Sequence, residues 1–131
     1  MGEAGAAAVR ALVGSRFRLH GRDGDGGMDC VGVAAAALRA DGFAGVVPTG
    51  YALRGGRRDD VVALLDRTAA RCDGDAPGDV LLFAAGPGQW HLAVRVAGGI
   101  VHADASLRRV VERPGVPPWQ LIGGWRVREA G

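Results

Sequence analysis

The spacing of apolar residues changes once along this chain, and that change limits the folds the chain can adopt. Before the turn at 76–79, apolar residues recur at the intervals of helices. After the turn they form short runs or alternate with polar residues, as strands do. Helices followed by strands are typical of an α+β domain with an antiparallel sheet. With 131 residues the chain has room for one such domain, so we expect a single domain over 1–131.

Capping and breaking residues set the expected bounds of the elements. Helices are predicted at 3–13, from 30 to about 42, and at 60–71, the last one capped by Asp59. Strands are predicted at 80–83, 91–96, 100–104, 109–112 and 125–128, with a loop at 17–27 and a rigid link at 114–118. We therefore expect a helical N-terminal half supporting a sheet of five or six strands, with Trp119 and Trp125 in the core.

The composition argues against several classes of function. A formal net charge of +2 is too small to indicate nucleic-acid binding, and no stretch approaches the ~18 apolar residues of a membrane span. The N-terminus lacks the apolar block of a secretory signal, so we expect synthesis in the cytoplasm and another route for any action outside the cell. The two cysteines lie far apart and make a poor disulfide framework, so Cys72 is expected to be a spare, partly buried thiol.

Cys30 is the strongest candidate for a reactive group. Glycines at 26 and 27 precede it, Asp29 is placed to cap a helix, and an alanine-rich helical run follows it. This pattern predicts a thiol in the first turn of a helix, where unpaired N–H groups and the helix dipole favour negative charge. Cysteine in such a position tends to ionise more easily than the free amino acid, and the thiolate is the nucleophile.

Two histidines fall in consecutive predicted strands, and the register of that hairpin decides whether they can meet. A two-residue turn at 98–99 would leave His91 and His102 on one face but on the order of 13 Å apart along the strand. A four-residue loop at 96–99 would set His102 opposite Ala93 and make the imidazoles diagonal neighbours, roughly 7 Å apart at the backbone. A three-residue loop would separate them onto two faces. We predict the four-residue loop.

Cys30, His91 and His102 together supply what a thiol acyl-transfer enzyme needs. The thiol needs a base within reach, the base needs a partner on its other ring nitrogen, and N–H groups at the helix start can stabilise an oxyanion. We expect these roles in that order, with the thiol packed against the sheet face that bears both histidines. A metal site from the same residues is disfavoured because no CxxC or HxxxH pair is present, and no cofactor is expected.

Several short segments carry a family resemblance. They are Gly14-Ser15-Arg16-Phe17, Met28-Asp29-Cys30-Val31-Gly32-Val33, Pro77-Gly78-Asp79-Val80-Leu81-Leu82-Phe83, His91-Leu92-Ala93-Val94 and Ile100-Val101-His102-Ala103. In these the chain resembles the NlpC-type family of papain-like cell-wall cysteine peptidases, most closely its phage cell-wall peptidase branch. The resemblance implies a papain-like domain with Cys30 as nucleophile, His91 as base and His102 as the residue that orients the base. It also implies cleavage of peptidoglycan stem peptides, often at the γ-D-glutamyl–diaminopimelate bond, through a thioacyl intermediate.

Five residues are candidates for contact with the substrate. By the resemblance, Asp29 matches the acidic residue that precedes the nucleophile and lines the substrate site. Phe17 and Val31 stand where family members often carry tyrosine and serine, whose hydroxyls border the cleft, so they bear on substrate preference. From position alone, His20 could line the cleft or be a solvated loop residue. Trp90 could wall the cleft or pack the hairpin.

Two alternative functions remain open at this stage. One is another thiol acyl-transfer enzyme, such as an amidase, deamidase or transpeptidase, acting on a substrate outside the cell wall. The other is a non-catalytic module that binds a phage tail or the cell wall. The absence of a secretory signal fits an enzyme carried by a phage or phage-like particle, so phage-tail or gene-transfer-particle proteins are the partners we expect besides peptidoglycan.

Overall fold

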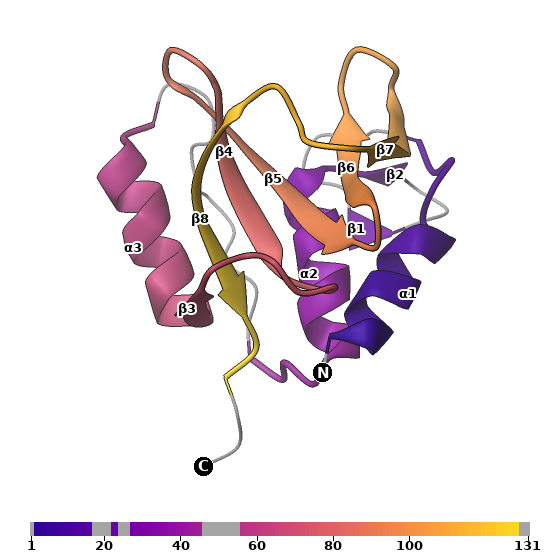
Figure 1. The fold of residues 1–131 in the computed structure, drawn as a ribbon, viewed down its shortest axis with the longest axis horizontal. Coiled ribbons are helices and arrows are strands. Elements are labelled where there is room, and N and C mark those ends of the chain that lie inside the picture. Colours follow the sequence, from indigo (N-terminus) through magenta and orange to yellow (C-terminus); the bar gives the residue numbers. More distant parts are fainter. Residues whose placement is uncertain (1, 17–21, 24–26, 46–55, 129–131) are drawn as a thin grey trace.

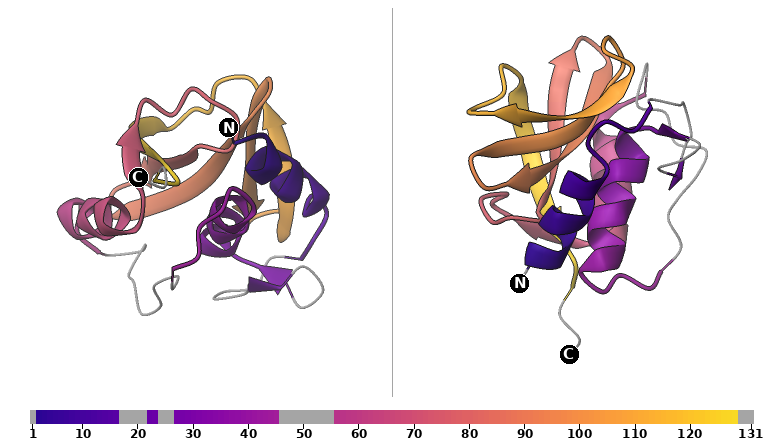
Figure 2. Two further views of the ribbon diagram at one scale, coloured as in Figure 1. Left: turned by 90° about the horizontal axis from the view of Figure 1, so that it is seen from below. Right: turned by 90° about the vertical axis from the view of Figure 1, so that its right-hand side faces the viewer.

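A computed structural model describes residues 2–16, 22–23, 27–45 and 56–128. Helices α1 (Glu3–Ala11), α2 (Cys30–Ala40) and α3 (Arg58–Thr68) lie on one side of a curved antiparallel sheet (Figures 1 and 2). Within these described residues the sheet has six strands, β3 (Ala70–Cys72), β4 (Val80–Gly86), β5 (Gln89–Val96), β6 (Gly99–Asp104), β7 (Arg109–Pro114) and β8 (Gln120–Arg126). Their order across the sheet is β3-β8-β4-β5-β6-β7. The expected α+β fold with helices packed on an antiparallel sheet is confirmed.

Several predicted element bounds are wrong. Arg57 rather than Asp59 occupies the N-cap of α3, and α3 ends at Thr68, so Cys72 lies in β3 and does not simply follow a helix. The predicted loop at 17–27 contains β1 (Arg22–Asp23) and the start of β2 (Gly27–Met28), which pair with each other. Strands of two or three residues are too short to show an alternating pattern, because their pairing partners and not their own sequence define them.

The last strand begins earlier than predicted, and two glycines explain the difference. Glycine is depleted in strands, so Gly123 and Gly124 weaken the strand signal within β8. The structure requires a small residue at Gly124, because a Cβ there would lie 2.7 Å from Gly74 Cα. Glycine at position 124 is therefore required by the close approach of these two backbones and not by strand propensity.

Two apolar clusters lie on the two faces of the sheet. The larger one lies between the sheet and the helices and includes Val33 of α2, Val94 of β5 and Trp125 of β8. The smaller one, on the opposite face, contains Leu81, Phe83, Ala93 and Ile100, with Trp119 packed against it. Trp125 is fully buried as expected, whereas Trp119 is only half-buried.

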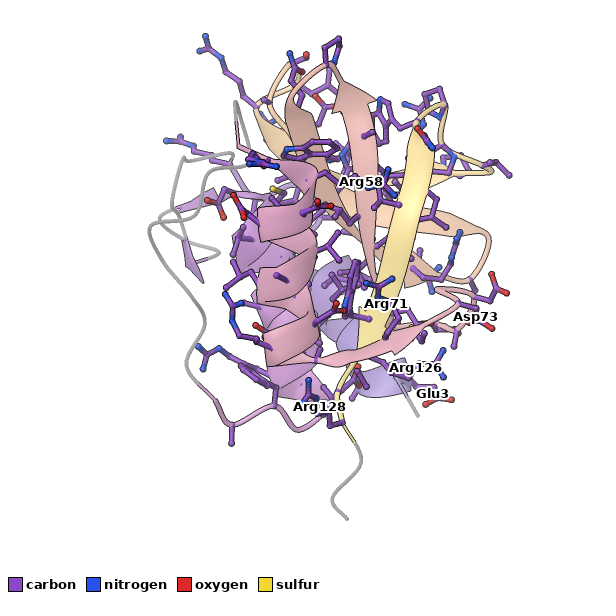
Figure 3. The ribbon with its side chains drawn as sticks, turned by 90° about the vertical axis from the view of Figure 1, so that its left-hand side faces the viewer. Glu3, Arg58, Arg71, Asp73, Arg126 and Arg128 are labelled. Carbon is purple, nitrogen blue, oxygen red and sulfur yellow. The ribbon has the colours of Figure 1, made fainter. Side chains whose placement is uncertain are left out.

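Helix α3 has few apolar contacts with the rest of the fold, since Val61 is its only fully buried residue among those described. Hydrogen bonds connect it to the edge of the sheet. Asp66 of α3 accepts from Trp125 Nε1 at 2.8 Å and from Arg71 Nε at 3.1 Å. These bonds hold the pKa of Asp66 below its usual value. Arg71 and Arg128 lie beside this helix in Figure 3, and Arg128 donates to the Asp66 carbonyl. No helix in the described part of the chain is long and apolar enough to cross a membrane.

Candidate active site

The β5–β6 hairpin brings the two histidines together. Val94 pairs with Val101, so the register places His102 opposite Ala93, as predicted. The ladder extends one pair further toward the turn than predicted, which leaves two residues, 97–98, in the turn instead of four. The predicted loop length is therefore wrong, but the predicted register is correct and brings the histidines together as expected.

The two imidazoles form a hydrogen-bonded pair. His91 Nε2 lies 2.8 Å from His102 Nδ1, and the rings meet edge to face with an interplanar angle of 88°. His102 is only 2% exposed, whereas His91 is half-buried. The bond occupies one nitrogen of each ring, so His91 Nδ1 is the nitrogen that remains for a second group. For Nδ1 to accept a proton, Nε2 must carry the hydrogen and donate it to His102.

Cys30 is the first residue of α2, and Asp29 caps the helix as predicted. The Asp29 carboxylate accepts from the Gly32 N–H at 2.8 Å, which satisfies one of the unpaired donors of the first turn. The N–H groups of Cys30 and Val31 interact with the sulfur instead and favour the thiolate. The helix start therefore directs two backbone donors toward the thiol.

The sulfur of Cys30 meets strand β5 at the backbone N–H of Leu92, the residue after His91. The Arg95 N–H donates to the Asp79 carbonyl, and the Arg95 carbonyl accepts from the Gly78 N–H, both just before β4. Successive residues of an antiparallel strand form backbone bonds to opposite neighbouring strands. The Leu92 N–H therefore points toward β6. The β5–β6 ladder covers only the three pairs next to the turn, and beyond it the two strands diverge (Figure 1). The thiol thus lies where the two strands part.

The expectation that the thiol packs against the sheet face bearing both histidines is wrong. Leu92 and Val94 of β5 point toward the helices and belong to the cluster that Cys30 contacts. Since successive residues of a strand point to opposite faces, His91 and Ala93 project to the other face, where Ala93 joins the smaller cluster. Cys30 therefore reaches the edge of β5 rather than the face that carries His91. No hydrogen bond joins this thiol to either histidine among the described residues.

Burial controls the protonation states of the thiol and of the base. Desolvation raises the pKa of the Cys30 thiol to about 11; the Asp29 carboxylate adds to the shift, while nearby N–H groups oppose it. The predicted easy ionisation is therefore not found in the resting protein. Desolvation lowers the pKa of His91 to about 4, with a further contribution from His102 and an opposing one from Asp104. At neutral pH both the thiol of Cys30 and the imidazole of His91 are therefore neutral.

Three residues near the histidine pair were not predicted from the sequence. Asp104 lies two positions after His102 on the same face of β6, so the strand period could have revealed it. Its carboxylate opposes the desolvation that lowers the pKa of His102, whereas the Arg113 guanidinium adds to that lowering. Trp119 lies edge to face against both imidazoles, and no local pattern in the sequence indicates this contact.

The residues predicted to contact substrate have structural roles where they are described. Trp90 packs against the larger cluster and donates from Nε1 to the Gly56 carbonyl at 2.7 Å. Val31 is buried in the same cluster, and the capping residue Asp29 is buried as well. Their contact with substrate stays a prediction. Phe17 and His20 lie outside the described residues.

A second group of side chains has the ligand types of a metal site. In the described part of the chain, Cys72, Asp73 and Asp79 come close enough to share an ion. However, Arg126 donates to Asp79 at 2.8 Å and lies 3.5 Å from Asp73. Figure 3 shows Arg126 and Asp73 on the β8 and β3 side of the sheet. Because a guanidinium already pairs with both carboxylates, the group does not have the character of a cation site.

Comparison with known proteins identifies the fold. No protein-family model matches the sequence, and no curated protein does. Among solved structures, the NlpC/p60 domain of the peptidoglycan hydrolase SagA is similar with a TM-score of 0.65 and 20% identity, over 97% of this chain and 99% of that one. The chain has the NlpC/p60 fold. This confirms the fold implied by the family resemblance, whereas the phage branch stays a prediction.

Two longer NlpC/p60-fold structures agree. NlpC2 from Trichomonas vaginalis matches with a TM-score of 0.72 and 18% identity, and NlpC1 from the same organism with 0.67 and 19%. Each match covers 95% of this chain, but only 45% of NlpC2 and 43% of NlpC1. The present chain thus spans less than half the length of these two proteins.

Proposed function

We propose that this protein is a cysteine peptidase that hydrolyses amide bonds in the stem peptides of peptidoglycan. The observation that carries the proposal is the hydrogen-bonded His91–His102 pair, next to the point where the helix-start thiol of Cys30 meets β5. The NlpC/p60 fold, shared with a domain of a peptidoglycan hydrolase, supports the substrate class. We further propose that the bond cleaved is the γ-D-glutamyl–diaminopimelate bond.

In the proposed first step, His91 Nδ1 takes the proton of the Cys30 thiol while the sulfur attacks the amide carbonyl carbon. His102 Nδ1 accepts the hydrogen bond from protonated His91 and stabilises the imidazolium. The tetrahedral intermediate then breaks its C–N bond, and the departing amine takes the proton from His91. In the second half of the reaction, His91 removes a proton from water while the water oxygen bonds to the thioester carbonyl carbon. The C–S bond then breaks, the carboxylic acid is released, and the sulfur takes the proton back from His91.

The protonation states of the resting site constrain this mechanism. Because the pKa of the thiol lies far above that of His91, a stable thiolate–imidazolium pair is not expected before substrate arrives. Proton transfer should therefore accompany attack on the carbonyl, where the negative charge passes to the substrate oxygen. The N–H groups of Cys30 and Val31, which interact with the sulfur in the resting protein, would donate to that oxyanion once the sulfur is bonded to carbon.

The decisive experiment is mass spectrometry of muropeptides released from purified peptidoglycan. Wild type and Cys30→Ala are compared with Cys72→Ala, a matched control because both cysteines are free and half-buried. We expect new fragments from wild type and Cys72→Ala and none from Cys30→Ala, with fragment masses that identify the cleaved bond. Identical muropeptides from all three proteins would refute the hydrolase.

The same set of proteins tests the alternatives. If wild type turns over small amides but leaves peptidoglycan uncleaved, the protein is another thiol acyl-transfer enzyme. Binding to peptidoglycan without any cleavage would identify a non-catalytic module. Carriage by a phage or phage-like particle, proposed from the sequence, is tested by looking for this chain in purified particles.

A further inference from the structure

Trp119 makes contacts that a core residue does not need. Its ring centroid lies 5.2 Å from that of His91 and 5.4 Å from that of His102, with interplanar angles of 71° and 77°. The ring centroid of Phe83 lies 5.7 Å from that of the same indole. One half-buried side chain therefore touches both members of the histidine pair at once.

We propose that Trp119 is a positioning residue that shields the hydrogen bond between His91 and His102 from water and holds the tilt of both rings. Its catalytic importance rests on the proposed peptidase function, but its effect on the imidazoles does not. Edge-to-face contact with both rings restricts their rotation, and the 2.8 Å bond between them depends on that orientation.

The surroundings of the indole support this role. Trp119 comes directly before β8, on the smaller-cluster face, and the guanidinium of Arg113 from β7 lies 5.6 Å from its ring centroid. The indole is partly exposed, so removing it would open the histidine pair to solvent rather than leave a closed cavity. Among the described residues, the charged groups that act on the pair are Asp104 and Arg113, and neither forms the hydrogen bond itself.

Trp125 shows what a purely structural tryptophan looks like in the same strand region. It is fully buried in the larger cluster, and its Nε1 donates to Asp66. Trp119 is only partly buried, and it contacts imidazoles. A shared role in core packing would not account for that difference.

The test is an NMR titration of the imidazole nitrogens from pH 8 down to about pH 3, without substrate, in wild type, Trp119→Ala, Trp119→Phe and Arg113→Gln. Opening the pair to water should raise the pKa of His91 by about one unit or more in Trp119→Ala. Trp119→Phe, which keeps an aromatic ring, should restore most of the wild-type value. Arg113→Gln keeps the indole but removes the charge that lowers the pKa of His102, so it should raise the pKa of His102 and leave that of His91 nearly unchanged. Arg39→Gln, at the far end of α2, should match wild type.

Unchanged pKa values in folded Trp119→Ala, or a Phe variant indistinguishable from Ala, would overturn the proposal. A second test uses wild type alone and so does not depend on whether a variant folds. The N–H hydrogen shared by the two rings should give a resonance protected from exchange with water at pH 7, and rapid exchange would also overturn the proposal. If these results hold while wild type releases no muropeptides, only the peptidase function is refuted.

Discussion

Acid should destabilise this fold through His91, and the size of the effect follows from its pKa. The group titrates near 6.5 when exposed and near 4 in the folded protein, because the buried site disfavours the charged ring. A lowered pKa contributes stability above pH 6.5 that is lost as the pH falls toward 4. At about 1.36 kcal/mol per unit, this loss amounts to roughly 3 kcal/mol. Since small domains are stable by about 5–15 kcal/mol, the loss should be readily measurable.

Urea unfolding at pH 7.5, 6, 5 and 4 measures this term when wild type is compared with His91→Gln. Glutamine can still donate to His102 but does not titrate, so the variant lacks the contribution of His91 while His102 titrates in both proteins. We expect the free energy of unfolding of wild type to fall by roughly 3 kcal/mol more than that of the variant between pH 7.5 and 4. Parallel pH dependences in the two proteins would show that His91 is not desolvated as the structure indicates.

Three further predictions concern the helix cap, the sheet and the thiol. Asp29→Ala should lower the free energy of unfolding by about 0.5–2 kcal/mol in urea denaturation, because the Gly32 N–H loses its acceptor; an unchanged midpoint would contradict the cap. Gly124→Ala should cost roughly 1–3 kcal/mol by the same measurement, whereas Gly86→Ala should be nearly neutral; equal effects would show that the backbone approach at Gly124 is not tight. Alkylation of Cys30 by iodoacetamide should keep rising as the pH approaches about 11; a plateau below pH 8 would reveal a resting ion pair that the pKa values exclude.

Local features of the sequence predicted much of the candidate site. The Asp29 cap and the start of α2 at Cys30 depend on residues within one helical turn, so the sequence alone could indicate them. His91 and His102 lie in adjacent strands of one hairpin, where only the length of the turn was unknown. Even with the turn length wrong, strand alternation and a short connection were enough to bring the two imidazoles together.

Tertiary packing decided the rest. Trp119 reaches the histidines only through the curvature of the sheet and the β7–β8 connection, so no spacing in the sequence indicates it. The pKa of Cys30 depends on how completely neighbouring elements remove water from the sulfur, and desolvation there outweighs the helix-start N–H groups that the sequence did indicate. Periodicity and capping are properties of consecutive residues, whereas exclusion of water and the parting of β5 from β6 are properties of the assembled core.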